Sequence, residues 1–258
     1  MIHTDYSKIA DQYDQNHLRH QIPRDQYLER QLSQWTISPC TSHFNVLDLA
    51  CGTGNWLKVQ MQEFPDSSIQ WHGLDASEDM LEVARDKVDQ VCFTQGTAEQ
   101  LPFEDRSFNY LNTHFAFHHF PNKTKALAEI KRVLHPGGKV KIWNISPHHM
   151  KDMWCYRFFP ETWWEDLKRF WDPSILFYEL EKLGFTVSLE THITRERVSL
   201  ARCLAQAENR DLSELHLISE EAYQSGLELM RTEIKKDPHC SLVQDLALML
   251  CVGDLNAP

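Results

Sequence analysis

The sequence has no excess of positive charge. Its 26 Lys and Arg residues stand against 37 Asp and Glu residues, which gives a formal net charge of −11. Such an acidic chain repels phosphate backbones and anionic lipid unless a local basic patch intervenes. We therefore expect no nucleic acid among its partners.

The sequence also lacks any cysteine or histidine spacing that is typical of a metal site. Its cysteines are scattered and odd in number, which indicates reduced cytosolic thiols rather than a disulfide framework. No CxxC motif, Cys/His motif or helical HxxxH motif occurs, so we expect no metal ion. The seven cysteines are Cys40, Cys51, Cys92, Cys155, Cys203, Cys240 and Cys251.

Long apolar runs are absent as well. No stretch of 18 apolar residues occurs, and the first residues, MIHTDYSKIADQYD, are polar where a signal peptide has a basic start and an apolar centre. We therefore expect a soluble, cytoplasmic protein without membrane insertion. With 258 residues and no linker-like segment, the chain is long enough for one core and a cap.

Short apolar runs alternate with segments of helical periodicity through the first part of the chain. These runs are rich in β-branched and aromatic residues, as buried strands are. The alternation predicts βαβ units, and hence an α/β fold with a doubly wound parallel sheet. Ser77 is a good N-cap for one of the helices between them. The runs lie at residues 44–50, 69–75, 91–96, 108–116 and 138–145.

The pattern changes after residue 145. A segment dense in aromatic residues, 153–171, is followed by a strand-like alternation at 186–194, and a last apolar run occupies 246–252. We interpret the helical stretch 198–236 as an insertion between the last two strands. A single domain, 1–258, would then consist of an N-terminal helical lid over the carboxyl edge of the sheet (1–35), a cofactor-binding core (44–145) and a substrate-side half with the cap insertion (146–258).

The strongest local signal is an apolar strand, a glycine turn and a helix, VLDLACGTGNW at residues 46–56. Glycine lets the backbone adopt positive φ and lets a ligand approach without meeting a Cβ atom. In open α/β sheets, ligands bind beyond the carboxyl ends of the strands, where this turn falls. Asp75 ends the next strand, 21 positions after Gly54, which is about the separation at which a carboxylate can accept both ribose hydroxyls. Together these features predict a nucleoside-containing ligand.

The same turn lacks the third glycine of a dinucleotide-binding fingerprint. The bulky Trp56 and Leu57 stand where close helix packing and pyrophosphate contact need a glycine. A Walker-type phosphate loop is excluded because GK[ST] is missing. A nicotinamide-dependent oxidoreductase is therefore the weaker alternative.

Four blocks resemble, in order and spacing, the class I S-adenosylmethionine-dependent methyltransferases, in particular the type 11 group with the ubiquinone and menaquinone biosynthesis enzymes. The segment YSKIADQYD (6–14) also looks like that group, and the resemblance fades beyond residue 145. It implies a Rossmann-like, seven-stranded, mostly parallel sheet with helices on both faces and a helical cap. S-adenosyl-L-methionine would be the methyl donor and S-adenosyl-L-homocysteine the product. The blocks are VLDLACGTGNW (46–56), GLDASEDML (73–81), GTAEQLPFEDRSFNYLNTHFAFHHF (96–120) and EIKRVLHPGGKVKIWN (129–144).

Carried over residue by residue, the resemblance implies a cofactor site along one edge of the sheet. The family commonly has an acidic residue at the position of Thr97, so the hydrogen bond to the adenine amino group would here fall to a hydroxyl. Asp48, Ala50, Gly52 and Gly54 would surround the methionine part, Asp75 would hold the ribose, and Ala76 and Met80 would flank the adenine. Thr97, Ala98 and Glu99 would lie at the adenine edge, His114 and Phe115 beside the sulfonium, and Tyr13 over the cofactor.

A sulfonium is an activated methyl donor, so such a site must chiefly align the acceptor and exclude water. His118 and His119 follow the fourth strand and could take a proton from an acceptor hydroxyl, or could only pack and meet solvent. The aromatic segment could line the pocket of an apolar acceptor or form the core of the cap. The residues that we expect to contact the acceptor are Tyr6, Trp154, Phe158 and Trp163.

We therefore expect a methyltransferase that modifies an oxygen atom, or a carbon or nitrogen atom, of a small-molecule metabolite. It would act as a monomer or a homodimer. The alternative is a protein on the same fold that binds an adenosyl ligand without catalysis, or that catalyses a reaction other than methyl transfer.

Overall fold

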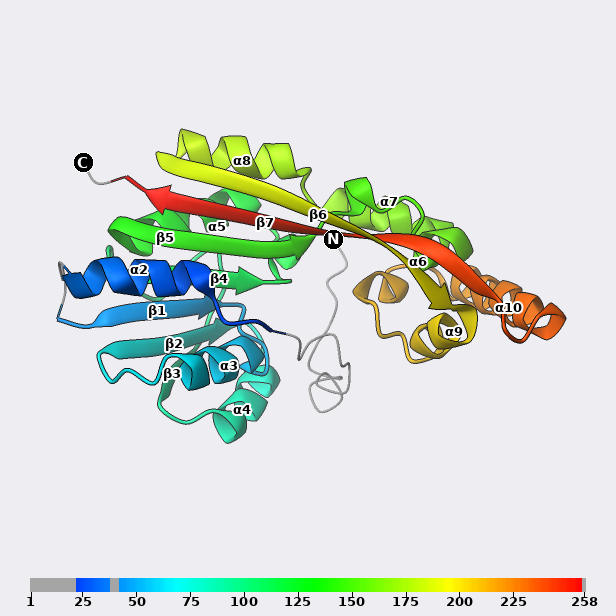
Figure 1. The fold of residues 1–258 in the computed structure, drawn as a ribbon, viewed down its shortest axis with the longest axis horizontal. Helices are drawn as coiled ribbons and strands as arrows, with labels where there is room; N and C mark the ends of the chain where they lie inside the picture. Colours follow the sequence, from blue (N-terminus) through cyan, green and yellow to red (C-terminus); the bar gives the residue numbers. More distant parts are fainter. Residues whose placement is uncertain (1–21, 38–41, 257–258) are drawn as a thin grey trace. The chain divides into compact units, whose positions relative to one another are not determined.

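A computed structural model describes residues 22–37 and 42–256, and in this part of the chain it shows a seven-stranded sheet of order β3-β2-β1-β4-β5-β7-β6. Strands β1 to β5 pair in parallel, whereas the arrows in Figure 1 show β7 running opposite to β5. The predicted mostly parallel α/β sheet is confirmed. The strands are β1 (Phe44–Leu49), β2 (Ile69–Asp75), β3 (Val91–Gln95), β4 (Phe108–His114), β5 (Leu134–Ile145), β6 (Phe185–Ser199) and β7 (Ser241–Leu255).

The helices lie between the strands, as the alternating pattern predicts. Ser77 caps α4 as expected, because its hydroxyl accepts a hydrogen bond from the Met80 N–H at 3.4 Å. None of the described helices is long and apolar enough to cross a membrane. The α-helices are α2 (Gln26–Ile37), α3 (Asn55–Glu63), α4 (Glu78–Lys87), α5 (Lys123–Val133), α6 (Trp154–Phe158), α7 (Pro160–Arg169), α8 (Pro173–Lys182), α9 (Leu200–Glu208) and α10 (Glu220–Lys236). The short 3₁₀ helices are η3 (Phe117–His119), η4 (Pro147–His149) and η5 (Ser213–His216).

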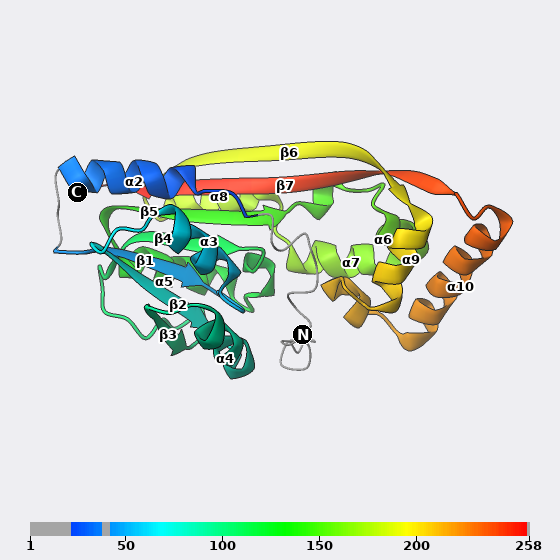
Figure 2. The ribbon, with the colours of Figure 1, turned by 60° about the horizontal axis from the view of Figure 1, so that its bottom comes forward.

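The described residues form two compact units. One, the sheet unit, contains residues up to 144 together with 174–189 and the end of the chain from 250. The other, the aromatic unit, contains residues 145–173 and 190–249. Strands β6 and β7 contribute residues to both units and lie side by side (Figure 2). The single domain expected from the sequence stays a prediction.

Helices α2 and α3 cover one face of the sheet unit. Figure 1 shows both on the near side of the sheet and α5 on the far side. A cluster of buried side chains joins Leu28 of α2 and Trp56 of α3 to the strands. Trp56 stacks on Tyr110 of β4, with ring centroids 6.5 Å apart. Trp56, directly before the position of the missing third glycine, therefore fills the space between α3 and the sheet.

Helix α2 differs in its position from the expected lid. Its last turns lie near the amino ends of the strands, because Trp35 contacts the ring of Phe44 and the Gln31 amide donates to the Gly137 carbonyl. The described part of the segment 1–35 thus covers the face of the sheet and not its carboxyl edge. The physical reason is its apolar side, which needs an apolar surface to bury. Residues 1–21 lie outside the described residues.

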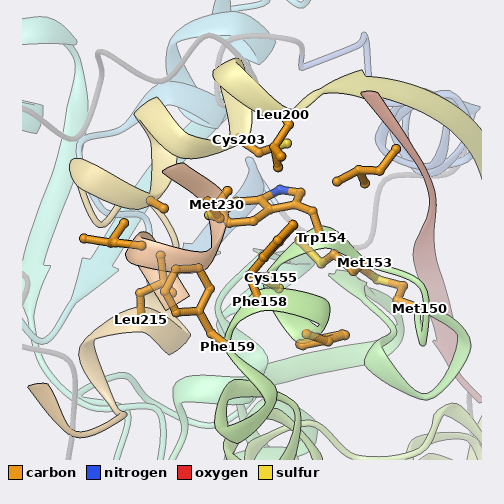
Figure 3. Close-up of a cluster of buried hydrophobic side chains, with 14 of the residues drawn as sticks. Met150, Met153, Trp154, Cys155, Phe158, Phe159, Leu200, Cys203, Leu215 and Met230 are labelled. Carbon is orange, nitrogen blue, oxygen red and sulfur yellow. The ribbon is translucent and has the colours of Figure 1, made fainter. Parts of the chain in front are cut away.

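The aromatic unit has a core of its own, shown in Figure 3. Its buried side chains come from the segment around α6 and from the helices between β6 and β7, which are α9, η5 and α10. Gly226 of α10 packs directly on the ring of Phe159, where an added Cβ atom would lie 2.3 Å from the ring. Helices α6 and α10 therefore approach as closely as they do because position 226 has no side chain.

Candidate functional site

The turn after β1 has the conformation that the glycine pattern predicts. Ala50, Gly52 and Gly54 all have positive φ, at 58°, 52° and 75°. A Cβ atom at Gly54 would lie 3.3 Å from the Cβ of Ala84, so this glycine allows the turn to pack on α4. A Cβ atom at Gly52 would meet nothing within 4 Å. The backbone at Gly52 is therefore open to the approach of a ligand.

The carboxylate of Asp75 is fixed at this turn. Its Oδ2 atom accepts a hydrogen bond from the Gly52 N–H at 2.8 Å, and its Oδ1 atom accepts one from the Ser77 N–H at 2.9 Å. Burial raises the pKa of Asp75, and the hydrogen bonds from these backbone amides oppose the rise. The end of β2 thus brings an oriented acceptor next to the open glycine. Its contact with a ribose stays a prediction.

Asp48 lies on β1, one strand away, and is almost completely buried. Its Oδ1 atom accepts a hydrogen bond from the Asn112 side-chain amide at 2.7 Å. Burial raises the pKa of Asp48 to about 7, although the Asn112 hydrogen bond and the charge of Lys141 both lower it. The carboxylate is therefore poised to lose its proton when a positive group arrives.

Polar residues inside the strands extend this site in a way that the sequence interpretation missed. Lys141 of β5 forms a buried ion pair with Asp25, at 2.6 Å, and Asp25 also accepts a hydrogen bond from the Tyr110 hydroxyl. In the register of the sheet, Asn112 of β4 lies beside Asp48 of β1 and beside Lys141 of β5, so the three side chains lie on one face of neighbouring strands. The signal was present in the sequence, because Asn and Lys interrupt otherwise apolar runs.

The end of β4 holds the two residues expected beside the sulfonium. His114 and Phe115 stack with ring centroids 4.5 Å apart. Burial, helped by the charge of Lys141, lowers the pKa of His114 to about 3, so its imidazole is uncharged at neutral pH. Phe115 has a φ of 53° and donates its N–H to the Trp143 carbonyl at 2.8 Å. These contacts fix both side chains, and their cofactor role stays a prediction.

The residues expected around the adenine also belong to the sheet unit. Met80 and Ala98 are buried, and the carbonyl of Ala76 accepts a hydrogen bond from a glutamine on β3. Thr97 forms a short bridge through its backbone carbonyl. Glu99 uses its carboxylate to accept the Asn122 N–H at 3.0 Å, at the start of α5. Glu99 therefore has a structural role, and its contact with a cofactor is untested.

His118 and His119 form η3 directly after the fourth strand. Their ring centroids lie 3.8 Å apart. His118 is buried and His119 is half-buried, and the Lys123 ammonium donates to the His118 carbonyl at 3.2 Å. This geometry keeps the two imidazoles together on one short turn. Their role as a general base stays a prediction.

The residues expected to contact the acceptor are distributed differently. Tyr6, like the cofactor candidate Tyr13, lies outside the described residues. Trp154 and Phe158 are buried in the core of the aromatic unit (Figure 3), and Trp163 is partly buried beside Tyr156 with ring centroids 5.6 Å apart. Trp154 and Phe158 thus pack in this core, and their contact with an acceptor stays a prediction. Residues 22–37 and 42–256 contain no group of three or more His, Cys, Asp or Glu side chains that could hold a metal ion.

Comparison with known proteins identifies the part of the chain that carries this site. A methyltransferase domain family matches residues 46–138. The demethylmenaquinone methyltransferase of Staphylococcus epidermidis is 34% identical over 148 residues, which cover 56% of this chain and 60% of that protein. The enzyme of the same name from Thermotoga maritima is 37% identical over 120 residues, covering 46% and 52%. The chain thus spans 60% or less of the length of these curated relatives.

Solved structures share the fold. A putative methyltransferase from an antibiotic biosynthesis pathway of Anabaena variabilis superimposes with a TM-score of 0.67 at 18% identity, covering 92% of this chain and all (100%) of that one. The phosphoethanolamine N-methyltransferase 2 of Haemonchus contortus, in complex with S-adenosyl-L-methionine, gives a TM-score of 0.52 at 20% identity and covers 88% and 52%. The segment 46–138 of this chain therefore matches a methyltransferase domain family, and the chain shares its fold with these solved structures.

Proposed function

We propose that the chain moves the methyl group of S-adenosylmethionine onto an oxygen, carbon or nitrogen atom of a small molecule. The acceptor atom's electron pair forms the new bond to the methyl carbon, the carbon–sulfur bond breaks, and its electron pair stays on sulfur as S-adenosylhomocysteine leaves. The observation that carries this proposal is the hydrogen bond from Gly52 to Asp75. It places an open glycine backbone beside an oriented carboxylate at the carboxyl ends of β1 and β2.

The residues of the site fit this cofactor, which supplies the activated methyl group. Asp75 would accept the ribose hydroxyls, and the open backbone at Gly52 would let the ligand lie close to the turn. His114, held neutral by its low pKa, would not repel a neighbouring cation. His118 or His119 would accept the proton that an acceptor hydroxyl loses.

The nature of the acceptor is a finer part of the proposal. The relatives carry the name demethylmenaquinone methyltransferase, so a short-chain demethylmenaquinol is the first acceptor to test. From the names of these relatives we propose an apolar or aromatic small molecule as the acceptor class. We also propose that the chain works in the cytoplasm, and the free thiols of all six described cysteines support this.

Calorimetric titration with S-adenosylmethionine and S-adenosylhomocysteine tests the cofactor. We expect micromolar binding, about −8 kcal/mol, that is lost in Asp75→Ala. Asp89→Ala, which removes an exposed carboxylate after α4, is the matched control and should bind normally. Absence of binding to the native chain would contradict the proposal. Binding without methyl transfer to any acceptor would instead favour a non-catalytic adenosyl-binding protein.

Single substitutions test the two histidines. We expect His118→Ala or His119→Ala to lower turnover by about 100-fold or more while leaving the affinity for S-adenosylhomocysteine unchanged. The measurement uses a labelled methyl donor and the acceptor found in the screen. Unchanged turnover in both variants would remove the pair from the mechanism.

A further inference from the structure

The indole of Trp143 has a buried hydrogen-bond donor that the described residues leave unused. Trp143 lies near the carboxyl end of β5, opposite His114, which is the last residue of β4. The residue is half-buried, but its Nε1 atom is buried and has no hydrogen-bond partner in the part of the chain that the structure describes. A buried donor without a partner costs free energy, so its retention at this edge of the sheet indicates a partner that arrives with a ligand.

Three contacts orient this indole at the end of the strand. Its ring meets the His114 imidazole edge to face, with ring centroids 6.0 Å apart. The Lys141 ammonium lies 5.7 Å from the centre of the indole. The Trp143 carbonyl accepts a hydrogen bond from the Phe115 N–H at 2.8 Å, which fixes the backbone beside the ring. The donor therefore has a defined position next to His114 and Phe115, the two residues that we expect beside the sulfonium.

The groups around the indole determine which kind of partner it can take. An indole N–H only donates, so the partner must be a hydrogen-bond acceptor. His114 is uncharged at neutral pH, because burial, helped by the charge of Lys141, lowers its pKa to about 3. The positive charge of Lys141 is compensated by the carboxylate of Asp25. These three residues together carry no net negative charge, so they do not repel an oxygen atom with partial negative charge.

We propose that Trp143 donates its indole N–H to a hydroxyl or carbonyl oxygen of the methyl acceptor. An oxygen atom has two lone pairs, so it can accept this hydrogen bond with one and attack the methyl group, or activate a neighbouring carbon, with the other. An amine nitrogen has a single lone pair, which the attack itself needs. Trp143 is thus a specificity-determining residue that selects oxygen-bearing acceptors over simple amines. This inference rests on the proposed function, because it narrows the acceptor class of that reaction.

The test compares two probes that differ only in their oxygen atoms. One is the short-chain demethylmenaquinol, a naphthalenediol kept reduced with dithionite, and the other is the naphthalene with the same side chain and no hydroxyl groups. Both are titrated into the chain in the presence of S-adenosylhomocysteine. We expect Trp143→Phe to weaken binding of the diol by about fivefold, since one hydrogen bond is lost. Binding of the naphthalene should stay within about twofold of the native value.

Trp56→Phe is the matched control. The indole nitrogen of Trp56 is also buried and without a partner among the described residues, but this side chain lies in the core between α3 and the sheet. Loss of its N–H should leave the affinity for both probes unchanged. A residue that only packs would affect the diol and the naphthalene alike. An equal loss for both probes in Trp143→Phe, or no loss for either, therefore overturns the inference.

The indole N–H of the native chain provides a second measurement. In a proton–nitrogen correlation spectrum, the signal of Trp143 is the indole signal that is missing from Trp143→Phe, or from Trp143→Tyr if the phenylalanine variant does not fold. We expect the diol to move this signal and the naphthalene to leave it in place, because a new hydrogen bond changes the shielding of the proton. A signal that does not move when the diol binds overturns the inference.

The result for S-adenosylhomocysteine separates this inference from the proposed function. A native chain that does not bind S-adenosylhomocysteine contradicts the proposed function and the inference with it. A native chain that binds S-adenosylhomocysteine but not the diol overturns the inference alone. A methylated acceptor that carries no oxygen has the same meaning, because methyl transfer would then occur without this hydrogen bond.

Discussion

The ammonium of Lys141 lies 2.6 Å from the Oδ2 atom of Asp25, and the two side chains are 9% and 1% exposed. The other oxygen of Asp25 accepts hydrogen bonds from the Tyr27 and Leu28 N–H groups at the start of α2. A single carboxylate therefore holds the first turn of α2 and compensates a charge in the middle of β5.

We expect Lys141→Met to lower the free energy of unfolding by about 3–5 kcal/mol, because it leaves Asp25 as an uncompensated buried charge. Urea denaturation of the intact chain measures this. Lys139→Met is the matched control on the same strand, since Lys139 pairs with Asp254, whose side chain is 51% exposed. Lys139→Met should lower the free energy of unfolding by about 0–1 kcal/mol. An equal loss of stability in the two variants would contradict the role assigned to the buried pair of Lys141 and Asp25.

Gly52 and Gly54 should respond differently to alanine. At Gly52 only the positive φ opposes a side chain, so Gly52→Ala should cost about 1–2 kcal/mol and should weaken cofactor binding by placing a methyl group where the ligand approaches. At Gly54 the methyl group also meets Ala84, so Gly54→Ala should unfold at lower urea concentration. Calorimetry and urea denaturation together separate the two effects. Normal binding of S-adenosylhomocysteine to Gly52→Ala would show that the open backbone is not a ligand surface.

Two carboxyl groups, those of Asp166 and Glu214, are buried in the aromatic unit. The side chain of Arg169 lies 2.5 Å from Asp166, whose side chain is 0% exposed, and Asp166 also accepts the Tyr156 hydroxyl at 2.7 Å. Burial has the largest effect on Glu214 and the charge of Asp166 the second largest, and together they raise its pKa to about 7. Glu214 accepts a weak hydrogen bond from the Cys155 thiol at 3.7 Å. The second carboxyl group therefore keeps its proton far above the usual range for Glu.

This raised pKa makes stability fall as pH rises. Between about pH 4.5 and pH 7, the folded chain keeps the Glu214 proton and the unfolded chain releases it, so stability is lost over that interval. We expect Glu214→Gln to be more stable than the native chain above pH 7, by on the order of 1–3 kcal/mol, and the difference to vanish below about pH 4.5. Urea denaturation across this pH range measures it, and a difference independent of pH would refute the assignment.

Glu220→Gln serves as a control of opposite sign. The hydrogen bonds from Gln224 and Arg210 lower the pKa of the exposed Glu220 carboxylate, so its contribution to stability is present at neutral pH and is lost as pH falls through the folded-state pKa. Replacing Glu220 should therefore lower stability at neutral pH and have no effect in acid. If the free energy of unfolding changed with pH in the same way in both glutamine variants, burial would not be the cause of the raised pKa of Glu214.

Gly226→Ala should destabilise the aromatic unit, because the new methyl group would overlap the ring of Phe159. We expect a loss of about 1–3 kcal/mol, although alanine favours a helix over glycine. Ser225→Ala, at the neighbouring exposed position of α10, should be neutral or slightly stabilising. Thermal unfolding followed by tryptophan fluorescence compares them. A gain in stability for Gly226→Ala would show that α10 can move away from α6 without cost.

The bounds of the elements show where local patterns suffice. The predicted strand 69–75 coincides with β2, since an apolar run and its terminal acid are local features. The last two strands extend beyond the predicted 186–194 and 246–252 because polar residues such as Arg195 and Asp245 pair with each other at 2.8 Å across the ladder. A pattern of alternating apolar residues cannot predict the part of a strand that carries paired polar side chains.

The sequence by itself determined the order of strands and helices, the glycine turn after β1 and the position of Asp75 beside it. These features depend on apolar periodicity and on backbone conformations that only a few residue types adopt. Both depend only on residues that are close together in the sequence. Only the tertiary structure decided that Asn112 meets Asp48, 64 positions away, and that Lys141 meets Asp25 across 116 positions. The pairing of strands and the packing of α2 bring these residues together, and burial then gives their charges an influence that no local pattern carries.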